Sequence, residues 1–142
     1  MLVCYSDVRS PKVAHINGNP QTQWLFYHPE WRIQIRAEGE AAVHHSDRVA
    51  REAWEAAPLE HRLNYCSPQA PGTEMTAEDL HTASAKSGQS WTQEEIETGI
   101  ANFAVIVTKV DQLDWLQLTA KGNRRAGFTW DGAQFTGRWL VA

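Results

Sequence analysis

The chain has 142 residues, of which 42% are hydrophobic and 21% are charged, and its formal net charge is −4. This length suits a single domain with a hydrophobic core of its own. No apolar run is long enough to span a membrane, so a membrane partner is not expected. The acidic balance argues against a nucleic-acid-binding surface, although it leaves room for a local cationic pocket that binds a small anion.

The sequence gives few signs of an oxidising compartment. Its two cysteines, Cys4 and Cys66, lie in no C-x-x-C motif, and the N-terminus lacks the charged and then apolar pattern of a secretory signal. We therefore expect free thiols and a cytoplasmic location. The seven tryptophans suit either a compact core or a site that stacks on a planar ligand.

The chain is predicted to open with a strand, a short helix and a second strand. Residues 1–6 are apolar and close with Ser-Asp, which is typical of a short buried strand. Ser10 as N-cap and Pro11 at the first helical position predict a helix that ends at the turn signal of residues 17–20. Residues 23–27, QWLFY, predict a strand that is central in its sheet, because it is mostly apolar.

A period-2 strand and a helical region are predicted next. From Trp31 to Ala37 apolar residues alternate with Arg32, Gln34 and Arg36, so that one face of the strand is polar. From Ser46 the period becomes helical, with Ser46 or Asp47 as cap, and Pro58 breaks or restarts the helix.

The remaining middle of the chain is predicted as a loop and two helices. Residues 64–72 form the loop, residues 76–87 carry a second N-cap signal, and residues 91–103 resemble a third helix with acidic residues in its first turn. Residues 72–89 have few large apolar side chains and are interpreted as a peripheral segment outside the core.

The end of the chain is predicted to be β-structure. Residues 103–110 form a strand, and residues 113–118 are its continuation or its partner. A turn at residues 121–123 leads into residues 124–130, and Asp131-Gly132 is a two-residue hairpin signal before the last strand. About seven strands with one helical insertion indicate a mainly β fold, an antiparallel barrel or sandwich with helices attached.

Several motifs in chain order resemble the FMN-binding split-barrel family, in particular its pyridoxamine 5'-phosphate oxidase-like branch. They are YSDVRSPK, NPQTQWLFY, IQIRAEG, SPQA and DWLQLTAKGNRR. The resemblance implies an antiparallel split β-barrel with a helical insertion, as a single domain over residues 1–142. It also implies FMN as cofactor and a symmetric homodimer with flavin sites at its interface.

The resemblance assigns roles to individual residues. Ser10 and Lys12 match the residues that contact the FMN phosphate, while Tyr5 and Ser6 lie along the flavin. Such a phosphate is well served by a helix N-terminus with a cation beside it. Gln34 matches a glutamine that reaches the flavin ring. The further matches are Gln69 in the insertion loop, and Trp115 and Arg125, which the family places near the flavin from the facing subunit.

One assignment is our own inference. Where the family often has arginine between the serine and the lysine, this sequence has Pro11, and Arg9 is expected to supply the missing guanidinium. Other interpretations of these residues are a solvated first turn for Arg9 and Lys12, a wet sheet face for Gln34 and a core position for Trp115. His44 and His45 are neighbours on a strand and point to opposite faces, so no metal site is expected there.

Two departures from the family pattern limit the functional expectation. The family has two further strands before the segment that opens this chain, so either the sequence is incomplete at its N-terminus or the protein has lost that hairpin. An arginine-proline pair and an arginine and histidine that bind substrate in the family appear here as Ala57-Pro58, Lys121 and Asn123. Oxidation of pyridoxamine phosphate is therefore not expected.

The sequence thus predicts an FMN-binding protein, a flavin-dependent oxidoreductase with an altered substrate site and an unidentified small-molecule substrate. No catalytic residue is assigned. One alternative is a non-catalytic dimeric scaffold of the same fold that binds no cofactor, motivated by the absent strands. Another keeps the fold but binds haem or a deazaflavin.

Overall fold

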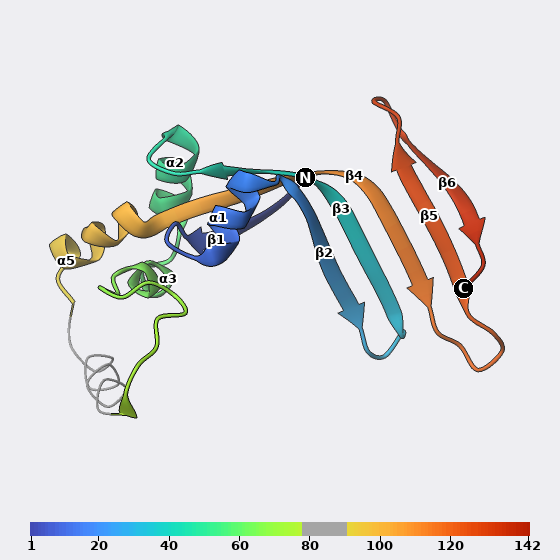
Figure 1. The fold of residues 1–142 in the computed structure, drawn as a ribbon, viewed down its shortest axis with the longest axis horizontal. Helices are drawn as coiled ribbons and strands as arrows, with labels where there is room; N and C mark the ends of the chain where they lie inside the picture. Colours follow the sequence, from blue (N-terminus) through green and yellow to red (C-terminus); the bar gives the residue numbers. More distant parts are fainter. Residues whose placement is uncertain (78–90) are drawn as a thin grey trace. The chain divides into compact units, whose positions relative to one another are not determined.

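The computed structural model describes residues 1–77 and 91–142. Figure 1 shows the strands and helices, whose order matches most of the sequence prediction. The strands are β1 (Leu2–Asp7), β2 (Gln21–His28), β3 (Ile33–His44), β4 (Phe103–Gln117), β5 (Arg124–Trp130) and β6 (Phe135–Leu140). The α-helices are α1 (Pro11–Gly18), α2 (Arg48–Ala56), α3 (Leu59–Arg62) and α5 (Gln93–Glu97), with 3-10 turns η1 (Leu63–Tyr65) and η2 (Thr98–Asn102).

The chain divides into two compact units. One, which we call the sheet unit, comprises residues 1–3, 16–42 and 107–142. The other, the helical unit, comprises residues 4–15 and 43–106. Because β1, α1, β3 and β4 each have residues in both units, the division falls within elements and not at linkers.

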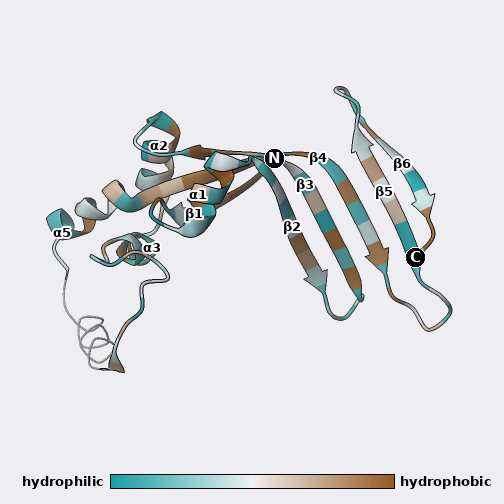
Figure 2. Ribbon diagram, in the orientation of Figure 1, coloured by the Kyte–Doolittle hydropathy of each residue, from teal (hydrophilic) through white to brown (hydrophobic). Residues whose placement is uncertain are grey.

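The strands form one six-stranded sheet with the order β2-β3-β4-β5-β6, and β1 pairs with β4 off this path. Neighbouring strands β2–β3, β4–β5 and β5–β6 are antiparallel. The mainly β fold with a helical insertion is confirmed, and the sheet does not close into a complete barrel within the described residues. In Figure 2 the alternation of apolar and polar residues along β3 is visible as changing colour.

The prediction that residues 23–27 form a central strand is wrong. They belong to β2, which is the end strand of the sheet path, and Leu25 and Tyr27 are 64% and 59% exposed. An apolar composition normally indicates burial on both faces. Here Trp24 is half-buried, while Leu25, Phe26 and Tyr27 remain exposed on the chain.

Close backbone contact joins β3 to β4 in the sheet unit. A Cβ atom added at Gly39 would lie 2.1 Å from the carbonyl oxygen of Lys109, so only glycine fits there. Nearby, the buried Thr108 hydroxyl accepts a hydrogen bond from Trp24 Nε1 at 2.9 Å. These contacts fix β2, β3 and β4 against one another.

The helical unit has an aromatic core. Trp54 of α2 and Phe103 of β4 are almost fully buried, with ring centroids 5.3 Å apart. Tyr65 packs edge-on against Phe103, at 4.9 Å. Arg62 donates to Glu97, which also accepts from the Trp54 indole N–H, so α2, α3 and α5 are joined by polar contacts around this core.

The structure selects one of the two alternatives for residues 113–118: residues 113–117 continue the strand of residues 103–110 in β4. Two further expectations differ from the structure. The loop between β5 and β6 spans residues 131–134 instead of two residues, because Trp130 pairs with Phe135 and Asp131 caps the loop N–H groups of Ala133 and Gln134. The helix expected at residues 91–103 is short and continues as the 3-10 turn η2.

The helix expected at residues 76–87 falls mostly on residues 78–90, outside the described part of the chain. Residues 1–77 and 91–142 hold no helix whose length and apolar character would let it cross a membrane.

Candidate functional site

The predicted site residues fall into two groups, one in each unit. The helical unit holds Tyr5, Ser6, Arg9, Ser10, Lys12 and Gln69, and the sheet unit holds Gln34, Trp115 and Arg125. Each group is described within its own unit.

The first group is built where β1 ends and α1 begins. The last two residues of β1, Ser6 and Asp7, are buried, and so is Ser10 just before α1. The Ser6 and Ser10 hydroxyl oxygens lie 3.1 Å apart and share a hydrogen bond. The Ser10 carbonyl accepts from Val13 N–H as the first turn of the helix forms. Two hydroxyl groups are therefore held at the N-terminus of an eight-residue helix.

Lys12 and Tyr5, the neighbours of Ser10 and Ser6 in the chain, are both exposed. Lys12 is exposed, and no ion pair of its ammonium group is found among residues 1–77 and 91–142. Tyr5 is 44% exposed and packs against Phe103, with ring centroids 5.1 Å apart. Because side chains alternate along β1, Tyr5 lies on the opposite side from Ser6.

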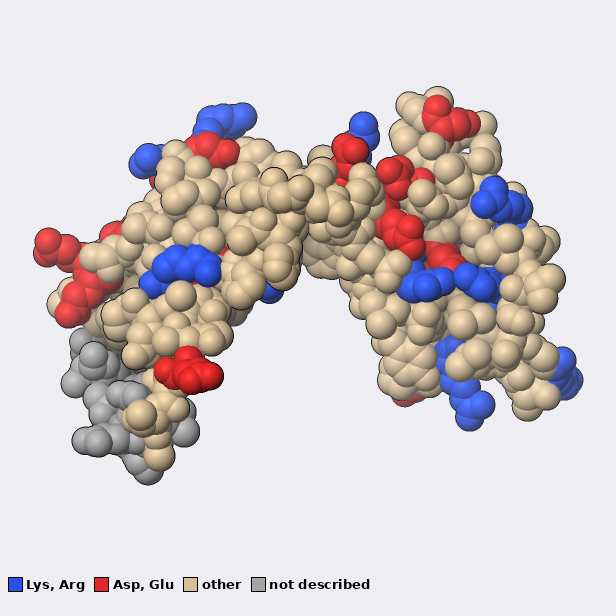
Figure 3. All heavy atoms as spheres, in the orientation of Figure 1, with Lys and Arg blue, Asp and Glu red and all other residues tan. Residues whose placement is uncertain are grey.

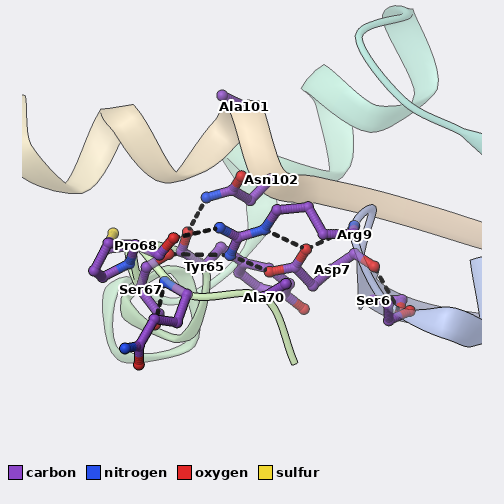
Figure 4. Close-up of polar contacts among 12 residues, drawn as sticks. Ser6, Asp7, Arg9, Tyr65, Ser67, Pro68, Ala70, Ala101 and Asn102 are labelled. Carbon is purple, nitrogen blue, oxygen red and sulfur yellow. Dashed lines mark hydrogen bonds and ion pairs between the residues drawn. The ribbon is translucent and has the colours of Figure 1, made fainter. Parts of the chain in front are cut away.

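Arg9 is held by Asp7, as Figure 4 shows. The Asp7 carboxylate accepts from the Arg9 backbone N–H at 2.8 Å, from Nε at 3.0 Å and from Nη2 at 2.7 Å. Burial raises the pKa of Asp7, but the hydrogen bonds and charge of Arg9 lower that pKa by more, so it lies below its ordinary value. Asp7 is therefore ionised and paired at neutral pH.

The guanidinium of Arg9 also reaches the insertion loop. Nη1 donates to the Pro68 carbonyl at 3.2 Å, and Nη2 donates to the Ser67 carbonyl at 3.0 Å. The four side-chain hydrogen bonds of Arg9 occupy most of its five N–H donors. The side chain that we expect to supply a guanidinium to a phosphate is thus engaged inside the chain.

Gln69 lies beside this arrangement, at the wall of a cavity of about 250 Å³. Its backbone N–H donates to the Ser67 hydroxyl. The cavity is lined by one carboxylate, two side-chain amides, two hydroxyls and several apolar groups, which belong to Asp7, Asn64, Ser67, Gln69, Ala70, Pro71, Gly72, Thr73 and Met75. The structure thus brings Gln69 and the Asp7–Arg9 pair to one site.

In the sheet unit, the second group centres on Asp114. Arg125 donates to the Asp114 carboxylate from Nε at 3.0 Å and from Nη2 at 2.7 Å. Arg36 forms an ion pair with the same carboxylate. The hydrogen bond from Arg125, together with Arg36, lowers the pKa of Asp114 to about 2 despite the opposing effect of burial.

This cluster carries a net positive charge, because two guanidinium groups share one carboxylate. Within the described residues, Arg36 Nε is buried without a hydrogen-bond partner. Figure 3 shows basic side chains lying next to acidic ones over the sheet. Gln34 is half-buried on β3, two residues from Arg36 and opposite Tyr27 of β2.

Trp115 and Arg125 lie on opposite faces of the sheet. In the β4–β5 register Arg125 is opposite Leu116, and Trp115 is opposite Ala126, so the two side chains differ by one strand position. Trp115 packs edge-on against Trp139, with ring centroids 6.5 Å apart. A ring lying flat on one face of this sheet therefore contacts only one of these two side chains of a given chain.

Sequence reasoning missed two residues that organise these groups. Asp7 was visible as an acid two positions before Arg9, and Asp114 as the one acid in a mostly apolar strand segment, LDWLQL. The sequence does not identify Arg36 as a partner of Asp114, because the two residues are 78 positions apart, nor the loop carbonyls that Arg9 reaches from Asp7, which are 58 and 59 positions from Arg9.

The adjacent histidines have structural partners. His44 Nδ1 lies 2.8 Å from Asp47 Oδ2, and His45 Nε2 lies 3.0 Å from the Ala101 carbonyl oxygen. No group of three or more histidine, cysteine or acidic side chains that could hold a metal ion is found in the described residues.

Comparisons with known proteins agree with this fold. Residues 1–45 match the family model of the pyridoxamine 5'-phosphate oxidase FMN-binding domain. A pyridoxamine 5'-phosphate oxidase-related, FMN-binding protein from Nostoc punctiforme has a similar structure, with a TM-score of 0.77 and 21% identity over 99% of this chain and 73% of the other. A search of curated proteins finds no match.

A second similar structure is that of PhzG from Burkholderia lata in complex with tetrahydrophenazine-1-carboxylic acid. Its TM-score is 0.71, with 17% identity over 99% of this chain and 68% of PhzG. The chain thus resembles the FMN-binding domain of pyridoxamine 5'-phosphate oxidase over residues 1–45, and its fold is that of the split-barrel proteins related to this oxidase.

Proposed function

We propose that this chain binds FMN as a homodimer and acts as a flavin-dependent oxidoreductase with an altered substrate site. The observation that carries the proposal is the hydroxyl pair of Ser6 and Ser10 at the start of α1, with the exposed Lys12 beside it. These residues lie within the segment that matches the FMN-binding family model.

The residues at this helix start fit a phosphate group. A phosphate dianion requires N–H and O–H donors and a cation, and the positive end of a helix dipole adds to the attraction. The Ser6 hydroxyl donates to the Asp7 carbonyl at 3.3 Å and lies 3.1 Å from the Ser10 hydroxyl, so a phosphate would bind here by replacing one of these hydrogen bonds. Lys12 supplies the cation, while Arg9 is occupied by Asp7.

We propose that Tyr5 and Gln69 contact the rest of the cofactor from the helical unit. Gln34, Trp115 and Arg125 of the sheet unit remain flavin contacts that the family resemblance predicts, the last two from the facing subunit. When bound, FMN supplies electron-transfer chemistry, and the protein binds and orients it. Cytoplasmic location remains a prediction from the cysteine pattern.

We also propose that the flavin sites lie at a dimer interface. Four large apolar side chains are exposed on the β2–β3 hairpin, at 43% to 65% of their surface: Leu25, Phe26, Tyr27 and Trp31. Successive side chains of β2 point to opposite faces, so this exposure lies on both faces of the hairpin, and exposed large apolar side chains grouped in this way favour an interaction site. The proposed substrate is a small molecule. Because Ala57-Pro58, Lys121 and Asn123 stand where the family binds its substrate with arginines and a histidine, we propose that this substrate is not held through a phosphate group.

The test is a titration of the purified chain with FMN and, in parallel, with riboflavin, which lacks the phosphate. Quenching of flavin fluorescence gives Kd. We expect FMN to bind at least about tenfold more tightly than riboflavin, since each charge-assisted hydrogen bond contributes roughly 1.5–3 kcal/mol. Lys12→Ala should weaken FMN about tenfold and leave riboflavin unchanged.

Lys109→Ala is the matched control, because Lys109 is an exposed lysine of β4 and should leave both affinities unchanged. An FMN affinity that is equal in the wild type and Lys12→Ala would contradict the proposal that the phosphate binds beside Lys12. Absence of flavin binding by the dimer would instead support the non-catalytic scaffold. Bound flavin with no reduction by any tested donor would limit the protein to a binding role.

A further inference from the structure

Arg9 is fixed between two parts of the helical unit. Its side chain joins the buried Asp7 carboxylate to the carbonyl groups of Ser67 and Pro68, and Figure 4 shows these contacts together. The Asp7 side chain is only 7% exposed. Moving Arg9 toward another anion would leave this carboxylate buried and unpaired, which is strongly unfavourable.

The loop whose Ser67 and Pro68 carbonyls bind Arg9 has further hydrogen bonds before and after these two residues. Before them, Asn102 Nδ2 donates to the Tyr65 carbonyl at 2.8 Å, and after them, the Thr73 hydroxyl donates to the Ala70 carbonyl at 2.8 Å. Between these contacts the chain is neither helix nor strand, and Pro68 has no N–H group to donate. The Arg9 hydrogen bonds therefore satisfy backbone carbonyls that secondary structure does not.

We infer that Arg9 is a positioning residue that acts through Gln69. Asp7 orients the Arg9 guanidinium, Arg9 fixes the Ser67 and Pro68 carbonyls, and the next residue, Gln69, is thereby held at the cavity wall. This inference rests on the proposed function, because Gln69 is one of the proposed flavin contacts. It replaces the direct phosphate contact that the sequence suggests for Arg9.

The Asp7→Asn variant separates the two roles by the sign of its effect. If Arg9 contacts the phosphate, removing the neighbouring negative charge frees the guanidinium and FMN binds more tightly. If Arg9 positions the loop, Asp7→Asn removes the ion pair that orients Arg9 toward the loop carbonyls. We then expect FMN to bind about three- to tenfold more weakly. Riboflavin affinity should fall by the same factor, because Gln69 acts on the ring and not on the phosphate.

Arg9→Lys provides the second variant, since lysine keeps the positive charge but lacks the planar fork that reaches Asp7 and two carbonyls together. Hydrogen exchange of the peptide covering residues 65–73 should be at least about tenfold faster in Arg9→Lys than in the wild type, without any flavin present. Arg51→Lys, an exposed arginine of α2, is the matched control and should leave this exchange unchanged.

A double-mutant cycle tests whether Arg9 acts through Gln69. Gln69→Ala should weaken flavin binding in the wild type but have almost no further effect in Arg9→Lys. Independent effects of the two substitutions, tighter FMN binding by Asp7→Asn, or unchanged exchange at residues 65–73 would each overturn the inference while leaving the flavin proposal intact. Failure of the wild type to bind flavin would overturn both, and would be recognised before any variant is compared.

Discussion

Two arginines of the candidate site are each held by an aspartate of the same unit. Arg9 pairs with Asp7 in the helical unit, and Arg125 pairs with Asp114 in the sheet unit. The carboxylate limits the directions in which each guanidinium can donate. At the residue scale, an arginine that is paired with an aspartate has fewer N–H groups free for a ligand and instead positions the residues around it.

Asp114→Asn is predicted to destabilise the protein at neutral pH. The substitution leaves Arg36 and Arg125 close together without the carboxylate that they share. We expect a loss of about 1 kcal/mol in the free energy of unfolding, less than the pKa shift alone implies, because water and salt reach both partly exposed arginines. Urea unfolding followed by tryptophan fluorescence measures this difference.

The pH dependence of this effect follows from the lowered pKa. Because the folded-state pKa of Asp114 is about 2 and its ordinary value is 3.8, the carboxylate contributes stability above pH 4 and loses it as pH falls toward 2. The difference between the wild type and Asp114→Asn should therefore shrink from pH 5 to pH 3. Glu52→Gln, in the exposed Arg48–Glu52 pair, is the control and should show little effect at either pH. A difference independent of pH would contradict the assignment.

At the scale of elements, capping side chains determine where the helices of the insertion begin. Asp47 precedes α2, and its carboxylate accepts from the Ala50 N–H at 2.9 Å. Thr92 and Glu95 form a reciprocal capping box at α5. Such caps satisfy N–H groups that have no partner within a helix. They bring α2 and α5 to the aromatic core formed by Trp54 and Phe103.

Asp47→Ala is predicted to lower the melting temperature by about 3–5 °C, because the first turn of α2 loses its cap. Asp47→Asn should remain within about 2 °C of the wild type, since asparagine caps a helix nearly as well as aspartate. Circular dichroism at increasing temperature gives both values. Equal losses in the two variants would mean that the contact with His44, and not the cap, carries the stabilisation.

At the scale of the whole molecule, the open sheet leaves apolar surface at the end strand β2. Leu25 and Tyr27 are exposed there although the strand pairs with β3 along its whole length. End strands with exposed apolar side chains favour association unless a partner or a charge protects them. The proposed dimer would bury this surface.

Tyr27→Glu is therefore predicted to weaken the dimer at least about tenfold, because a carboxylate would enter an apolar interface. Light scattering during size-exclusion chromatography should give twice the mass of one chain for the wild type, and a concentration-dependent lower mass for the variant. Leu59→Glu is the control, since it places the same charge at an exposed apolar position of α3. A wild type that is monomeric in the presence of FMN would contradict the proposed assembly.

The sequence by itself determined the local elements. The start of α1 at Ser10-Pro11, the cap of α2 at Asp47 and the period-2 strand through Gln34 were predictable, because caps, proline geometry and alternation act between residues close in the chain. The family motifs are read from the same short segments, which explains why the resemblance could be recognised before the fold was known.

Only the tertiary structure decided which residues meet. It placed β2 at the end of the sheet, joined residues 103–117 into one strand, put Trp115 and Arg125 on opposite faces, joined Arg36 to Asp114, and brought Arg9 to the Ser67 and Pro68 carbonyls. Strand order and long-range ion pairs depend on packing between segments that are distant in the chain. Local composition is compatible with many such pairings, so only the packing contacts of the folded chain select one of them.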